Sequence, residues 1–342
     1  MKSIFKVLPV VAVTALLSTG ALAEQITLKV HHFLPAGSTQ QKKVIEPWCE
    51  RINKDSKDRL KCQIYPSMQL GGTPPQLVNQ VRDGVVDVIF TLPGYTPGRF
   101  PIAEVFELPF MMEDPEATSK ALWDYVAKYD TKEFSDYKLL SLNVHGPGVF
   151  HMVNKQINTL EDLKGMKVRA PTRQTNKMLA ALGATPVAMP VPQVGEALSK
   201  SVIDGALVPY EVVPAVKIQE LVKFHSETDP TEPAIYCAEF MFAMNKAKYQ
   251  SLPADLKAVI DRNSGKALSG EAGKAFDLAD EAGKKTTMKN THNVIPANEL
   301  RRFKAASQSV SEAWIKEVTA KGANGKQLLE TAKELIAANS KK

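Results

Sequence analysis

Residues 160–190 read LEDLKGMKVRAPTRQTNKMLAALGATPVAMP, and this stretch decides the expected fold. A short strand is expected around Val168, a helix from Thr175 to Leu182, and a second strand near Val187. A strand, a helix and a further strand in this order form a crossover unit, which joins parallel strands. The stretch therefore predicts an α/β fold.

The same alternation of strands and helices extends to both sides of this stretch. It predicts strands over 26–33, 60–65, 85–90 and 202–208, and helices over 38–53, 75–83 and 193–200. Such a series favours a largely parallel sheet with helices on its faces.

The length of the chain and one break in a strand indicate two lobes. A strand-like segment begins near Leu139, is interrupted by Gly146, Pro147 and Gly148, and resumes at Val149. Such a break suits a hinge, and 342 residues are long for a single core. A long stretch of helix formers over 253–290 is expected to run along both lobes. We expect one lobe to comprise residues 24–147 and 237–275, and the other to comprise residues 148–236 and 276–342. The closing helices, over 297–321 and 325–339, are expected to pack on the second lobe.

The first residues have the composition of a secretory signal peptide. Lys2 and Lys6 precede an apolar run over 7–17, and the small-residue triplet at 21–23 suits cleavage after Ala23. The run is too short to cross a bilayer as a helix. We expect residues 1–23 to be removed and the mature protein to act in the periplasm.

The charge of the chain excludes some classes of partner. The formal net charge is +6, and the basic residues are interspersed with acidic ones along the helical segments. Nucleic acid and anionic lipid attract longer basic runs. No nucleic-acid partner is therefore expected.

Three cysteines occur in the chain, at positions 49, 62 and 237. Cys49 lies on the apolar face of the helix expected over 38–53, and Cys62 alternates with apolar residues in a strand, so both thiols are expected to point inward. Export favours a Cys49–Cys62 disulfide over two buried free thiols. Cys237 lies in an apolar run and is expected in the core.

Searches for catalytic and metal-binding motifs find no match. SGKALSGEAGKA, from Ser264 to Ala275, has two glycines at phosphate-loop spacing, but Glu271 and Ala272 stand where Lys and Ser or Thr are needed. The six histidines form no HExxH pattern, and no GxSxG turn is present. We therefore expect no enzyme activity, no metal site and no cofactor.

Arg169 is the residue whose position points most directly to a ligand. It ends the short strand around Val168 and is followed by Ala170 and Pro171. Ligands of open α/β sheets bind beyond the carboxyl ends of the strands. A guanidinium there can hold a carboxylate by two parallel hydrogen bonds, although a surface salt bridge is the alternative.

Several short motifs of the chain, in order, resemble those of the solute-binding proteins of TRAP (tripartite ATP-independent periplasmic) transporters. The family's GxKxR strand and GAxP strand are matched by Gly165, Lys167, Arg169, Gly183, Ala184 and Pro186. Further matches are Leu70-Gly71-Gly72, Asp83-Gly84 with Asp87, Leu108-Pro109-Phe110 and Asp204-Gly205. The resemblance implies a two-lobed protein that closes on a ligand in the cleft. It also implies that Arg169 holds a carboxylate and that the ligand passes to membrane permease subunits.

The departures from the family pattern suggest what the ligand is. Members that bind polar sugar acids often carry an Asn where this chain has Val208, and a second Arg where it has Val149. Phe33 and Leu92 likewise stand where such members place polar residues. An apolar pocket would leave ligand hydroxyls unsatisfied at ~1–3 kcal/mol each. The ligand is therefore expected to be an aromatic or apolar monocarboxylate or a 2-oxo acid, with these four residues and Tyr95, Phe110, Tyr210 and Tyr236 as candidate contacts.

Three alternatives to this reading stay open at the level of sequence. A C4 dicarboxylate could use Arg173 or His151 for its second carboxylate, although Arg173 could instead be a surface charge at a helix start. The same cleft could serve a ligand-sensing partner of a membrane receptor. It could also belong to a periplasmic enzyme built on the same scaffold.

Overall fold

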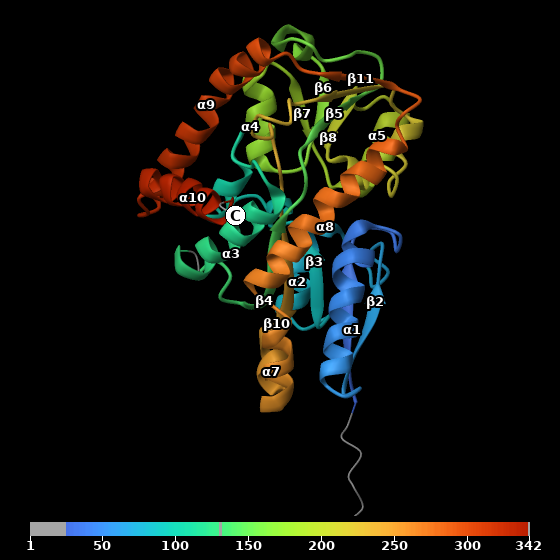
Figure 1. Cartoon of the computed structure of the whole chain (residues 1–342), viewed down its shortest axis with the longest axis vertical. Coiled ribbons are helices and arrows are strands. Elements are labelled where there is room, and N and C mark those ends of the chain that lie inside the picture. Colours follow the sequence, from blue (N-terminus) through green and yellow to red (C-terminus); the bar gives the residue numbers. More distant parts are fainter. Residues whose placement is uncertain (1–24, 130–131, 341–342) are drawn as a thin grey trace, which may run out of the picture.

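The computed structural model describes residues 25–129 and 132–340, which form two lobes, each built on one β-sheet (Figure 1). The predicted signal peptide lies outside the described residues. The first sheet has the strand order β2-β1-β3-β10-β4, and the second has the order β11-β9-β5-β8-β6-β7. None of the helices within the described ranges combines the length and apolar character that crossing a bilayer requires. The predicted two-lobed α/β fold is confirmed.

The strands of the first sheet are β1 (Ile26–His32), β2 (Leu60–Tyr65), β3 (Val88–Thr91), β4 (Tyr137–Val144) and β10 (Glu239–Asn245). Those of the second are β5 (Val149–Met152), β6 (Lys167–Ala170), β7 (Thr185–Ala188), β8 (Gly205–Val208), β9 (Phe224–Glu227) and β11 (Thr291–Val294). The helices are α1 (Glu46–Asp55), α2 (Leu77–Arg82), α3 (Pro115–Tyr129), α4 (Arg173–Ala181), α5 (Val194–Ser199), α6 (Lys246–Ser251), α7 (Ala254–Arg262), α8 (Lys266–Lys285), α9 (Ala297–Ala320) and α10 (Gly325–Ser340).

Each sheet combines parallel and antiparallel strand pairs. β1 pairs in parallel with β2 and β3, and β6 pairs in parallel with β7 and β8. All four residues of β3 and of β8 are buried, as expected for parallel strands covered on both faces. β10 returns from the second lobe and pairs antiparallel with β3 and β4. Parallel pairing places the carboxyl ends of β1 and β3 side by side at one edge of the first sheet, and those of β6 and β8 side by side at one edge of the second.

Helix α8 runs along both lobes, as predicted (Figure 1). It packs on α3 and β4 of the first lobe and on the 3₁₀ turn Tyr210–Val212 of the second. Gly283 makes this last contact possible, because a Cβ there would lie 2.1 Å from the backbone oxygen of Tyr210. The expected helical stretch over 253–290 is not continuous, since Gly265 has a φ of 94° and separates α7 from α8.

The last helix does not follow the expectation that both closing helices pack on the second lobe. α9 contacts α4 of the second lobe, whereas α10 lies along α3 of the first (Figure 1). The chain reverses between them at Gly322, whose φ of 92° suits a glycine. α10 then buries Leu328, Leu329 and Ile336. The predicted lobe boundaries remain a prediction in their other details.

The predicted Cys49–Cys62 disulfide is confirmed. The two Cα atoms lie 5.7 Å apart, so the bridge joins α1 to β2 at the edge of the first sheet. Cys237 is free and buried. In the chain-entropy view, a bridge that closes so short a loop stabilises the fold by ~3 kcal/mol.

Thiol titration of denatured, unreduced protein is expected to find one reactive group per chain, that of Cys237. The same titration after reduction should find all three cysteines. Detection of three thiols without reduction would contradict the bridge in exported protein.

Candidate ligand-binding site

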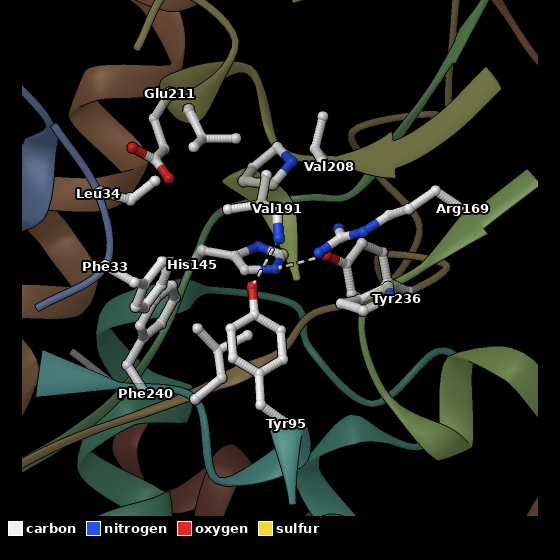
Figure 2. Close-up of a pocket in the computed structure, with 14 residues that line it drawn as sticks. Phe33, Leu34, Tyr95, His145, Arg169, Val191, Val208, Glu211, Tyr236 and Phe240 are labelled. Carbon is white, nitrogen blue, oxygen red and sulfur yellow. Dashed lines mark hydrogen bonds between the residues drawn. The ribbon is translucent and has the colours of Figure 1, made fainter. Parts of the chain in front are cut away.

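A pocket lies between the two lobes, at the carboxyl ends of the strands (Figure 2). The empty volume that its residues border is about 330 Å³, which includes space open to solvent. The first lobe contributes residues that follow β1, β3 and β4, together with Phe240 of β10. The second contributes Arg169 of β6, Val208 of β8 and residues that follow β6, β7 and β8, and Tyr236 lies on the segment that leads into β10. The lining residues are Phe33, Leu34, Leu92, Tyr95, His145, Arg169, Pro171, Val191, Val208, Pro209, Glu211, Val212, Tyr236 and Phe240.

Arg169 projects from β6 into this pocket and is only 2% exposed. Its Nε donates to the backbone oxygen of Met189 at 3.0 Å, and its Nη1 donates to that of Leu207, also at 3.0 Å. These two bonds fix the plane of the guanidinium and leave further N–H groups for a ligand. Among the described residues, no aspartate or glutamate lies within ion-pair distance of Arg169. A buried cation without an acidic partner is costly unless an anion joins it.

Two tyrosines and a histidine surround the guanidinium (Figure 2). The Tyr95 hydroxyl accepts the backbone N–H of Val191 at 3.0 Å, so its own proton is free to be donated. His145 donates from Nδ1 to the carbonyl of Gly146 at 2.6 Å. Its Nε2 therefore carries the lone pair, which faces the Tyr236 hydroxyl and the Ala238 N–H, each at 3.0 Å.

Burial keeps these three side chains uncharged. Burial, followed by the nearby charge of Arg169, lowers the pKa of His145 to about 4. Burial also raises the pKa of Tyr95 and of Tyr236 above the usual range of tyrosine. At neutral pH the pocket consequently presents one cation and neutral hydrogen-bonding groups at its Arg169 end.

The remaining wall of the pocket is largely apolar. Phe33 and Tyr95 meet edge to face, with ring centroids 5.5 Å apart. Aromatic and aliphatic side chains line the space beside them: Leu34, Leu92, Val191, Val208, Val212 and Phe240. Such a wall suits an apolar or aromatic body better than a hydroxylated one.

Six of the ten candidate site residues lie together around this pocket: Phe33, Leu92, Tyr95, Arg169, Val208 and Tyr236. Val149 lies opposite Val208 on β5 and is buried one strand further away. Tyr210 points into the second lobe, where its hydroxyl donates to Glu227 at 2.9 Å. Phe110 packs against the core of the first lobe. The role of the six in binding remains a prediction.

The two residues considered for a second carboxylate are occupied elsewhere. Arg173 donates from Nε to Glu104 at 2.6 Å and from Nη1 to Glu317 at 2.9 Å. His151 lies within 2.6 Å of His225 and 3.2 Å of the Val208 carbonyl. Neither side chain lines the pocket.

Arg173 instead connects the lobes, because it begins α4 of the second lobe while Glu104 belongs to the first. Replacing both by glutamine removes both charges of this pair, and Glu317, which loses Arg173, keeps Lys177 and Lys321 as partners. We expect the double variant to bind every acid more weakly by the same factor, ~3–10-fold, because only closure loses stability. Calorimetric titration with several acids measures this, and a factor that varies with the acid would show that Arg173 contacts the ligand.

Sequence reasoning did not identify several lining residues, chiefly Leu34, His145, Pro171, Val191, Glu211 and Phe240. His145 precedes the break at 146–148 that suggested a hinge, and Phe240 lies in an apolar run that looked like core. Glu211 follows Tyr210, which was the candidate in that turn. A 3₁₀ turn over Tyr210–Val212 aims Glu211 rather than Tyr210 at the pocket.

Comparisons with known proteins agree with this geometry. A profile of the family described as DctP, bacterial extracellular solute-binding protein, family 7, matches residues 30–317. A TRAP solute-binding protein from Rhodoferax ferrireducens T118, solved with copurified benzoate, is 51% identical with a TM-score of 0.92, covering 93% of this chain and 99% of the other. Another from a marine metagenome, solved with 3-hydroxybenzoate, is 46% identical with a TM-score of 0.91, covering 93% and 100%.

A more distant relative has a different ligand in its name. The C4-dicarboxylate-binding periplasmic protein DctP of Rhodobacter capsulatus is 27% identical over 280 residues, which is 80% of each chain. The family profile spans most of the chain, and the similar structures cover more than nine-tenths of it. The chain therefore belongs to the DctP family of bacterial extracellular solute-binding proteins, the solute-binding proteins of TRAP transporters.

Proposed function

We propose that this protein captures an aromatic monocarboxylate in the pocket between its lobes, with Arg169 as the partner of the carboxylate. The observation that carries the proposal is the buried guanidinium, which is held by two backbone carbonyls and has no acidic partner among the described residues. A ligand carboxylate would supply the missing charge through a planar, two-pronged pair. Tyr95, with a free hydroxyl proton, could donate a further hydrogen bond to the same carboxylate.

The apolar wall supports an aromatic ring as the rest of the ligand. Phe33, Phe240 and Val208 offer contact surface and no hydrogen bonds from their side chains. The two similar proteins that share about half of their residues with this chain were solved with benzoate and 3-hydroxybenzoate. Together these points favour an aromatic acid over a 2-oxo acid or a bulky aliphatic one.

A C4 dicarboxylate fits the pocket less well. Arg169 is the single Arg or Lys among the lining residues, and the lining also includes the acidic Glu211. A second ligand carboxylate would meet no cation and would approach another carboxyl group.

Family membership supports the remaining steps of the proposal. The bound acid would be delivered in the periplasm to the permease subunits of a TRAP transporter, and the protein itself would leave the acid unchanged. A genomic neighbour that encodes a multi-spanning permease would favour transport over sensing.

Mass spectrometry of ligand released from freshly purified, denatured protein tests the proposal directly. Recovery of an aromatic acid, and its rebinding by the refolded protein, is the expected result. Calorimetric titration with benzoate, a C4 dicarboxylate and a 2-oxo acid should rank benzoate first. Tighter binding of the dicarboxylate would overturn the proposal, and chemical conversion of the bound acid would indicate an enzyme.

A further inference from the structure

Glu211 is the one acidic side chain among the residues that line the pocket. It belongs to the 3₁₀ turn Tyr210–Val212 and is only 5% exposed. Figure 2 shows its carboxyl group at the end of the pocket opposite the guanidinium of Arg169, close to Leu34. The pocket therefore has two polar ends, and an apolar wall separates them.

No cation balances this buried carboxyl group. Among the described residues, no Lys, Arg or His lies within ion-pair distance of Glu211 or of Asp280 on α8. The backbone N–H of Glu211 donates to Asp280 at 2.7 Å, and the Thr39 side chain hydrogen-bonds the Glu211 carboxyl group. Burial raises the pKa of Glu211 to about 7, and burial together with Glu211 raises the pKa of Asp280.

A protonated carboxyl group can both donate and accept a hydrogen bond, and this holds for the protonated fraction of a partly protonated one. If the aromatic ring of the ligand carried no substituent, the Glu211 carboxyl group would face carbon atoms. A buried polar group would then have no hydrogen-bond partner on the ligand. A phenolic hydroxyl donates and accepts in the same way, so it satisfies Glu211 in either protonation state. A second carboxylate on the ligand cannot satisfy Glu211 in this way, since it would add negative charge where no cation lies.

We propose that Glu211 selects aromatic acids that carry a hydroxyl group on the ring, remote from the carboxylate held by Arg169. This inference rests on the proposed function, because it assumes that an aromatic carboxylate occupies the pocket. It goes beyond that function by assigning a second polar contact and the ligand substituent that meets it.

Calorimetric titration with benzoate, 3-hydroxybenzoate and 4-hydroxybenzoate tests the assignment. The wild type is expected to bind the better hydroxybenzoate about tenfold more tightly than benzoate. Glu211→Leu should reduce this preference to near unity, by weakening the hydroxybenzoate and strengthening benzoate. Glu211→Gln, which keeps a donor and an acceptor and resembles the native side chain in shape, should retain part of the preference. Glu196→Gln, at an exposed position of α5, should behave as the wild type.

Each outcome decides between the two proposals. If the wild type binds benzoate at least as tightly as both hydroxybenzoates, or if neither Glu211 variant changes the preference, the role of Glu211 is overturned and the proposed function stands. If no aromatic acid binds the wild type, the proposed function falls and the role of Glu211 falls with it. Because Glu211→Gln adds no bulk, it supplies the decision should Glu211→Leu fail to fold.

Discussion

Replacing Arg169 by alanine is expected to weaken binding of the best aromatic acid by ~30-fold to several thousandfold. Removing one member of a buried charged pair typically costs ~2–5 kcal/mol, which corresponds to that range. Arg169→Lys keeps the charge but loses the planar fork, so its affinity should fall between those of the wild type and the alanine variant. Calorimetric titration measures the series, with Arg51→Ala as a control because Arg51 forms an exposed pair with Glu271, away from the pocket lining.

Stability without ligand has to be measured beside affinity in this series. Arg169 holds the carbonyls of Met189 and Leu207, so the alanine variant loses two donors as well as the ligand partner. Each orphaned carbonyl costs ~1–3 kcal/mol if it stays buried. A folded alanine variant that binds aromatic acids as tightly as the wild type would show that the carboxylate is held elsewhere.

Replacing Gly283 by alanine is expected to destabilise the protein, although alanine is ordinarily the better helix former by ~1 kcal/mol. The new Cβ would lie 2.1 Å from the backbone oxygen of Tyr210 and 3.0 Å from the nitrogen of Glu211. Either α8 or the turn Tyr210–Val212 must move, and overpacking of this kind costs ~1–3 kcal/mol. Since the turn carries Glu211 and Val212 of the pocket, affinity for aromatic acids should fall as well.

Gly195→Ala is the matched control for this change. Gly195 also lies in a helix, but the nearest atom to its new Cβ would be 3.6 Å away, which is ordinary contact. Thermal melts should show a lower midpoint for Gly283→Ala and an equal or higher one for Gly195→Ala. Equal midpoints for both variants would mean that α8 does not press on the turn.

Much of the fold could be predicted from the sequence because local patterns and tertiary packing agree. The alternation Leu60, Cys62, Ile64 fits β2, and the crossover unit over 160–190 became β6, α4 and β7. β9 and β11, four residues each, were missed because such short, partly polar strands have no clear period of their own. They become strands through parallel pairing with each other and, for β9, antiparallel pairing with β5.

The pocket residues at strand ends could be predicted, because the strand determines the direction in which their side chains point. The pocket residues in turns could not. Arg169, Phe33 and Val208 lie at or directly after strands, so their approach to the cleft follows from topology. Tyr210 and Glu211 are neighbours in a 3₁₀ turn, and sequence alone does not say which one faces inward. α8 decides this, because it packs against the turn from outside. The pairing of Arg173 with Glu104 was equally invisible, since 69 residues separate them along the chain.

The bond between the Tyr95 hydroxyl and the backbone of Val191 has a kinetic consequence. Tyr95 follows β3 of the first lobe and Val191 belongs to the second. This hydrogen bond in the wall of the pocket therefore joins the two lobes. The surrounding aromatic side chains are 2–7% exposed, so they shield a bound molecule from solvent while this hydrogen bond holds. Residence time therefore depends on how often the lobes part. A partner that pulls the lobes apart would release the cargo without ever touching it.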